Sequence, residues 1–292
     1  MIDSMVSEAV RRYIISRQSQ YLSANTITFY KTQLRTFSNY CSDLGWFTLD
    51  ITPDRLVEYL SLRREHRKPT TLEAEFRAIH AFLTWCIERK YCNPDTLDGV
   101  KWPKAPKPVI EPFTQGDVRG LLREAAKSPT PERDVAILLL MADCGLRASE
   151  LCGLKDSDVR ETYIHVHGKG GKERRVPIAP ETLSVIRRWQ KVRGPCTYLF
   201  ISQRGKPFTR EGLRVLFKRL GKRAGVVDVR CSPHTLRHTT AQEWLDGGGD
   251  LETLRLLLGH ARLETTMRYL VVGYSHVARK HKELSLGKQL LE

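Results

Sequence analysis

The stretch Asn93–Pro112, NPDTLDGVKWPKAPKPVIEP, divides the chain into two parts with different patterns. It holds five prolines in 20 residues. Proline lacks a backbone amide proton and disfavours helix in the residue before it. We therefore expect an extended, semi-rigid linker over residues 93–112. The linker carries three lysines, Lys101, Lys104 and Lys107.

Residues 1–92, before the linker, read as a small domain of four helices. Apolar residues at helical spacing, such as Ile27, Leu34 and Phe37, predict a helix from about Asn25 to Tyr40. Thr52-Pro53 has the form of an N-cap followed by a proline at the first helical position. The other two helices are expected over about 4–18 and from about residue 70.

Residues 113–274, after the linker, read as mostly helical with one small antiparallel sheet. Tyr163–His167 alternates like a strand, Gly168–Lys172 is a turn, and Arg175–Ile178 is the returning strand. Helices are expected from about 114, through the apolar run 135–142, over 181–192, 209–224, 233–245 and 250–258, and from 263. The fold class is therefore mainly α with a small antiparallel β-sheet, in two domains followed by a tail, 275–292.

Composition and charge narrow the classes of function. The 292 residues carry a formal net charge of +15, with net +3 before residue 106 and net +12 after it. Such an excess favours an anionic partner, of which nucleic acid is the commonest, although solubility alone could explain it. The longest apolar run has eight residues, too few for a membrane span of about 20. No basic-then-apolar secretory leader is visible, and seven scattered cysteines indicate a reducing cytoplasm.

Polar residues with the chemistry of phosphate recognition gather in the second part. Ser232-Pro233 begins a helix, so His234 and Arg237 share its first turn, where free amides favour an anion. A capped surface helix is the alternative. Arg147, after the apolar helix, needs a partner that Glu150 could supply, and a structural ion pair would look the same.

Three further residues are ambiguous when taken singly. His260 follows Gly259, a helix stop signal, and could cap carbonyls there. Tyr269 could be a core aromatic. Lys169 could lie on a solvated hairpin tip. Taken together, two Arg, one Lys, two His and one Tyr without a carboxylate cluster suit phosphoryl transfer without a metal, with Tyr as the nucleophile.

Four motifs, CGLRASELCGL, GKGGKERRVPI, SPHTLRHT and LLGHARLETTMRY, occur in this order, and together they resemble the signature of the tyrosine recombinase (phage integrase) family. The resemblance covers about 109–275 strongly. The helical domain resembles the family's SAM-like core-binding domain more loosely. The family resemblance implies a clamp around double-stranded DNA and strand exchange at specific recombination sites, through a Holliday junction.

The resemblance also implies a role for each residue. Tyr269 would attack the scissile phosphate and form a 3′-phosphotyrosyl link, while Arg147 and Arg237 would hold its oxygens. Lys169 would protonate the leaving 5′-oxygen, with Lys172 as a rival. The remaining roles are proton transfer by His234, a phosphate hydrogen bond from His260, support from Glu150, and DNA contacts by Lys101, Lys104, Lys107, Lys172, Arg174 and Arg175.

The family implies no cofactor and a homotetramer on two DNA sites, with the C-terminal tail docking on a neighbouring subunit. Accessory or directionality proteins are possible partners. Leu-Val-Val follows Tyr269 where Xer proteins often have Thr-His. This difference argues slightly against a role in chromosome-dimer resolution. The chain also lacks the extra N-terminal domain that binds arm sites in some phage integrases. A nucleoid-associated, cytoplasmic enzyme without membrane contact is expected.

Two other classes of function stay open at this point. A strand-relaxing enzyme of the type IB topoisomerase kind would share the chemistry, but it would not pair two sites. A DNA-binding regulator on the same fold would lack the chemistry, against which the complete residue set argues.

His165 and His167 lie on one face of the expected strand. They could be two metal ligands, but we find no third ligand near them in the sequence. Outward-facing polar residues are the favoured interpretation, and no metal site is predicted.

Overall fold

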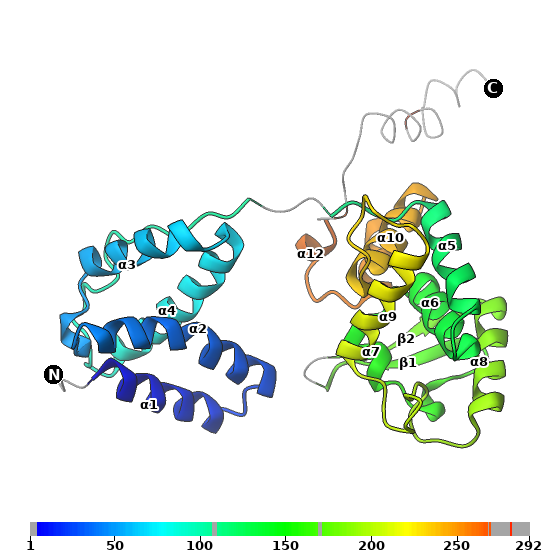
Figure 1. Cartoon of the computed structure of the whole chain (residues 1–292), viewed down its shortest axis with the longest axis horizontal. Helices are drawn as coiled ribbons and strands as arrows, with labels where there is room; N and C mark the ends of the chain where they lie inside the picture. The colour runs from blue at the N-terminus through cyan, green and yellow to red at the C-terminus, as the bar shows by residue number, and fades with distance from the viewer. Residues whose placement is uncertain (1–4, 107–109, 169–170, 268, 270–280, 282–292) are drawn as a thin grey trace. The chain divides into compact units, whose positions relative to one another are not determined.

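The computed structural model describes residues 5–106, 110–168, 171–267, 269 and 281. The chain forms two compact units, Met1–Pro108 and Val109–Glu292, and the division falls inside the predicted linker (Figure 1). Each unit has its own hydrophobic core. Within the described ranges, no helix is both long and apolar enough to cross a membrane.

The first unit is helical. Its elements are α1 (Val6–Ser19), α2 (Ala24–Asp43), the 3-10 helix η1 (Thr48–Asp50), α3 (Pro53–His66) and α4 (Pro69–Glu88). The start of α3 follows the predicted pattern, since the Thr52 hydroxyl accepts a hydrogen bond from the Arg55 amide and Pro53 opens the helix. The core contains several buried aromatic rings, among them Tyr13, Phe37, Tyr59, Phe76 and Phe82.

The first half of the predicted linker packs on this unit. Asn93 Nδ2 donates to the carbonyl of Leu49 over 3.3 Å. The indole ring of Trp102 lies edge-on to Phe76, with ring centroids 5.0 Å apart. Prolines predict an extended backbone, but they do not indicate which apolar side chains reach a core, so these contacts were not foreseen.

The second unit is mostly helical, with one hairpin. Its elements are α5 (Gln115–Ala126), α6 (Pro131–Cys144), α7 (Ala148–Gly153), the 3-10 helix η2 (Asp156–Asp158), β1 (Tyr163–His167), β2 (Glu173–Pro177), α8 (Pro180–Arg193), α9 (Arg210–Arg223), α10 (Pro233–Asp246), α11 (Leu251–Leu258) and α12 (Leu263–Met267). The predicted fold class is confirmed. Helix α6 carries the apolar run found in the sequence; most of its interior is buried in the core, and its two ends, Val135 and Ala142, are partly buried and pack against that core.

The hairpin pairs β1 with β2 in antiparallel register, with Ile164 opposite Val176 and His167 opposite Glu173. The side chains of Ile164, Val166 and Val176 are buried in the core. His165 and His167, which alternate with them, lie on the other face and are partly exposed. This alternation is the strand pattern expected from the sequence.

Candidate active site

A tight turn between α6 and α7 places Arg147. Gly145 ends α6 in the left-handed conformation with φ of 56°. A Cβ added to Gly145 would lie 2.8 Å from a Leu258 methyl carbon, so a larger residue would not fit here. Arg147 then stands at the N-cap of α7, with its side chain partly exposed.

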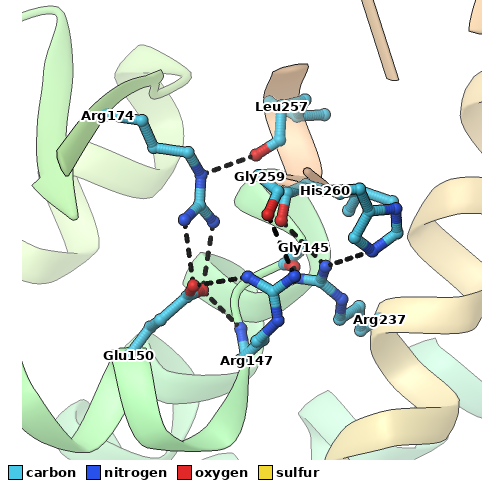
Figure 2. Close-up of polar contacts among 9 residues, drawn as sticks. Gly145, Arg147, Glu150, Arg174, Arg237, Leu257, Gly259 and His260 are labelled. Carbon is cyan, nitrogen blue, oxygen red and sulfur yellow. Dashed lines mark hydrogen bonds and ion pairs between the residues drawn. The ribbon is translucent and has the colours of Figure 1, made fainter. Parts of the chain in front are cut away.

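Glu150 joins two arginines, Arg147 and Arg174 (Figure 2). Its carboxylate accepts from the Arg147 amide at 2.9 Å and from Arg147 Nη1 at 2.8 Å. It also accepts from both Nη atoms of Arg174, at 2.9 and 3.0 Å. Burial alone would raise the pKa of Glu150, but the hydrogen bonds and charges of the two arginines outweigh burial and lower the pKa to about 2. Glu150 is therefore a carboxylate at neutral pH.

Arg237 is the buried cation of the site. It lies in α10, which begins as predicted, with the Ser232 hydroxyl accepting from the Thr235 amide and Pro233 in the first turn. Arg237 is only 3% exposed. Its guanidinium donates to the carbonyl oxygens of Gly145 and Leu258 and to His260 Nε2. Burial first, and the charge of Arg147 second, lower the pKa of Arg237 to about 10, so it stays protonated at neutral pH.

The contacts of His260 determine its protonation state. A guanidinium can only donate, so His260 Nε2, 2.9 Å from Arg237 Nη2, must be the accepting nitrogen. The proton is then on Nδ1, which lies 2.9 Å from the Thr266 hydroxyl oxygen. His260 is therefore a neutral imidazole with its proton on Nδ1.

Tyr269 lies between two histidines. Its ring stacks on His260 with centroids 6.0 Å apart and an interplanar angle of 8°, and His238 meets it edge-on at 4.8 Å. The side chain is 3% exposed and belongs to an apolar cluster with Ala241, Leu245, Leu254 and Leu258. Tyr269 is thus a core aromatic and a neighbour of the arginine site at once.

The other predicted residues are placed as follows. His234 is exposed on the first turn of α10. Lys172, Lys101 and Lys104 are exposed, and the Arg175 guanidinium lies 5.1 Å from the centroid of the Tyr163 ring. Lys169 and Lys107 lie outside the described residues, as does the tail 275–292 apart from His281.

Sequence reasoning missed three parts of the site. Arg174, predicted as a DNA contact, is held between Glu150 and the carbonyl of Leu257, to which its Nε donates over 3.0 Å. Thr266 and His238 were not singled out at all. For His238 a signal existed, because it lies one helical turn after His234, whereas nothing local pointed to Thr266 or to the Arg174–Glu150 pair.

The arrangement brings together residues from four separate segments. Arg147, Arg174 and Arg237 supply three positive charges around the one carboxylate of Glu150, a local excess of two (Figure 2). Each terminal guanidinium nitrogen carries two protons. Both Nη atoms of Arg147 and Nη1 of Arg237 use one proton for a protein partner and can hold a further acceptor, whereas Nη2 of Arg237 already donates to Leu258 and to His260. Such a site suits a phosphodiester, whose negative charge grows in the transition state of phosphoryl transfer.

Comparison with known proteins identifies the class. Residues 111–276, more than half of the chain, match the model of the phage integrase family. Tyrosine recombinase XerC of Escherichia coli is 33% identical over 280 residues, which cover 92% of this chain and 93% of that protein. The chain therefore belongs to the phage integrase family of tyrosine recombinases.

Solved structures agree on the fold over both units. XerH recombinase in a post-cleavage complex on a palindromic difH substrate matches with a TM-score of 0.74 and 21% identity, covering 98% of this chain and 86% of that one. The Tn1549 transposon integrase in complex with transposon right end DNA matches with a TM-score of 0.77 and 18% identity, covering 96% and 99%. The chain is an enzyme of site-specific DNA recombination, and the topoisomerase and regulator alternatives are not favoured.

Proposed function

We propose that Tyr269 cleaves DNA by attacking a phosphodiester that is held by Arg147 and Arg237. The bond from the tyrosine oxygen to phosphorus forms while the bond from phosphorus to the 5′-oxygen breaks. Lys169 donates a proton to that 5′-oxygen, and His234 takes the phenolic proton. The product is a 3′-phosphotyrosyl link, and attack by another 5′-hydroxyl reverses the steps and joins a new strand.

The single observation that carries this proposal is the continuous contact from Arg237 through His260 to Tyr269. Arg237 binds His260 directly, and the His260 ring stacks on the Tyr269 ring. A nucleophile, a neutral imidazole and a buried cation therefore meet in one place, although Arg237 lies in α10 and Tyr269 follows the end of α12. Glu150 positions Arg147 and does not itself touch the phosphate in this mechanism.

The wider assembly is also part of the proposal. XerH and the Tn1549 integrase were solved on DNA substrates, and we infer that this chain acts on duplex DNA in the cytoplasm as a tetramer that joins two sites. Lys101, Lys104, Lys107, Lys172 and Arg175 are the proposed backbone contacts. The proposed event is integration, excision, resolution or transposition, and the Leu-Val-Val that follows Tyr269 argues against chromosome-dimer resolution.

The test is covalent adduct formation. The wild type, Tyr269→Phe and the control Tyr21→Phe are incubated with DNA from the source locus in the presence of EDTA. Tyr21 is a matched control because its side chain is 97% exposed in the first unit. We expect a protease-sensitive protein–DNA adduct from the wild type and from Tyr21→Phe, and none from Tyr269→Phe. An adduct that persists in Tyr269→Phe would overturn the assignment of the nucleophile.

A further inference from the structure

The two histidines of β1, His165 and His167, lie beside two carboxylates that the sequence did not place there. Asp158 comes from η2, before the strand, and Glu173 comes from β2, directly opposite His167 in the hairpin register. The third ligand that the sequence lacked is therefore supplied by the fold.

The distances describe a compact group. His167 Nε2 lies 3.1 Å from Asp158 Oδ1, and His167 Nδ1 lies 2.9 Å from Glu173 Oε1. His165 Nε2 lies 3.1 Å from Glu173 Oε2. Asp158, His165 and His167 each offer one ligand atom, and these three atoms lie within 4.8 Å of one another.

This spacing is close to that of a metal centre. Bond lengths of about 2.0–2.1 Å in a tetrahedral zinc site put neighbouring ligand atoms roughly 3.3 Å apart. The group would therefore have to contract by an ångström or so, which rotation of the two imidazole rings can provide. Both rings are partly exposed, with 35% and 46% of their side-chain surface accessible, so an ion can reach them from solvent.

One ligand is already held in place. Asp158 is buried, and its Oδ2 accepts a hydrogen bond from the Lys155 amide over 2.8 Å. That bond directs Oδ1 of the same carboxylate towards His167. Such a fixed outer contact is typical of metal-binding carboxylates, because it lowers the cost of ordering the ligand when the ion binds.

We propose that Asp158, His165 and His167 bind one divalent transition-metal ion, His167 through the Nε2 that faces Asp158, while Glu173 orients the His167 ring through its contact with Nδ1. Two imidazoles and one carboxylate suit zinc, cobalt or nickel, whereas magnesium and calcium favour sites made of oxygen atoms alone. The ion would join η2 to β1, in the hairpin whose sequence carries Lys169 between its two strands. This proposal does not depend on the cleavage mechanism, which is tested in EDTA.

The test is metal binding by the intact protein after treatment with a chelator. Zn²⁺ is titrated by calorimetry into the wild type, His165→Gln, His167→Gln and the control His66→Gln, a histidine exposed in the last turn of α3. We expect one equivalent bound by the wild type and by His66→Gln, and affinity at least tenfold weaker in the other two. Equal affinity in all four proteins, or no binding by the wild type, would overturn the proposal.

Three further measurements guard against binding elsewhere and against loss of folding. Seven cysteines are potential competitors, so Co²⁺ absorption is recorded, and strong thiolate charge-transfer bands would place the ion at cysteine and refute the site. Zn²⁺ should also raise the melting temperature of the wild type and of His66→Gln but not of His165→Gln, because an ion that binds only the folded state stabilises it. An equal rise with Mg²⁺ would count against the proposed ligands. Circular dichroism confirms that each variant is folded.

Discussion

At the residue scale, Glu150 organises the site by satisfying two arginines that come from different elements. Arg147 precedes α7 and Arg174 lies on β2, so the carboxylate fixes the hairpin to the turn after α6. A buried carboxylate with four such hydrogen bonds stays ionised. Removing the carboxylate leaves two guanidiniums without their counter-charge. The folded state then loses more free energy than the intact ion pairs contribute to it.

We expect Glu150→Gln to lower the free energy of unfolding at pH 7 by about 3 kcal/mol, as estimated from its lowered pKa. A carboxyl whose folded-state pKa is lowered stabilises the fold above its unfolded pKa. That stabilisation is lost as the pH falls from about 4.5 to about 2. Urea denaturation at pH 7 and pH 3 measures it, and the difference between wild type and variant should shrink at pH 3. A difference that does not depend on pH would contradict this origin.

Arg237→Lys tests the need for a guanidinium at the buried position. A lysine keeps the charge but cannot reach Gly145, Leu258 and His260 together. We expect adduct formation to slow by roughly 10²–10³-fold, the usual effect of losing one transition-state donor. Rates are measured by quenched time courses on a denaturing gel. The matched control is Arg11→Lys, on an exposed helix face of the first unit, and an equal effect there would refute the interpretation.

At the element scale, the turn at the end of α11 positions the arginine side chains of the site. Gly259 stops the helix in the left-handed conformation with φ of 64°, as the sequence predicted. A Cβ at this position would lie 2.7 Å from the Arg174 guanidinium. The same turn offers the carbonyls of Leu257, Leu258 and Gly259 to Arg174, Arg237 and Arg147, respectively. One short turn therefore aligns all three cations.

Gly259→Ala should therefore lower the free energy of unfolding by more than alanine does at a glycine with the same backbone conformation and open space around it. Gly225→Ala is the matched control, with φ of 71° and no atom within 4 Å of the added Cβ. The left-handed backbone alone costs about 1–2 kcal/mol in both variants. We expect a further loss of about 1–3 kcal/mol in Gly259→Ala, where hydrogen bonds of the charged Arg174 are disturbed. Urea denaturation gives the free energy of unfolding of both variants. An equal decrease in the two would mean that Arg174 makes room for the added Cβ without losing its hydrogen bonds.

The elements also show what a sequence can and cannot predict. Thr52, Ser232 and Gly259 mark helix ends through contacts a few residues away, so they were visible in the sequence. The motif residues Arg147, Arg237, His260 and Tyr269 were singled out by residue type and by the resemblance to the tyrosine recombinase family, and their catalytic roles stay predictions. The Arg174–Glu150 pair and the approach of Asp158 to His167 depend on how η2, β1, β2 and α7 pack together. No local rule describes such packing, and for this reason Arg174 was expected only on DNA and no metal site was expected.

At the scale of the whole molecule, the charge distribution predicts how the protein meets DNA. The chain carries net +15, of which +12 lies after residue 105. Contacts to phosphates release condensed counterions, so the logarithm of affinity falls linearly with the logarithm of salt concentration. The unit that holds the arginine site is therefore also the unit with most of the electrostatic attraction.

We expect the affinity for a labelled DNA duplex to fall by about 10³–10⁵ between 50 and 200 mM salt, as for six to ten phosphate contacts. Fluorescence anisotropy at several salt concentrations gives the slope. Lys172→Gln, an exposed position in the catalytic unit, should reduce the slope by roughly one contact. A slope near zero in the wild type would mean that the charge serves solubility and not binding.

The lowered pKa of Arg237 has a consequence for the protein without DNA. Burial and the neighbouring Arg147 make the charged form less favourable in the folded state than in water. The one carboxylate of Glu150 leaves a local excess of two positive charges among the three arginines, and the main-chain carbonyls of Gly145 and Leu258 add only partial negative charges at Arg237. A phosphodiester would neutralise this excess, so substrate binding and the stability of the catalytic unit are linked. The catalytic unit should therefore be harder to unfold with DNA bound than without it.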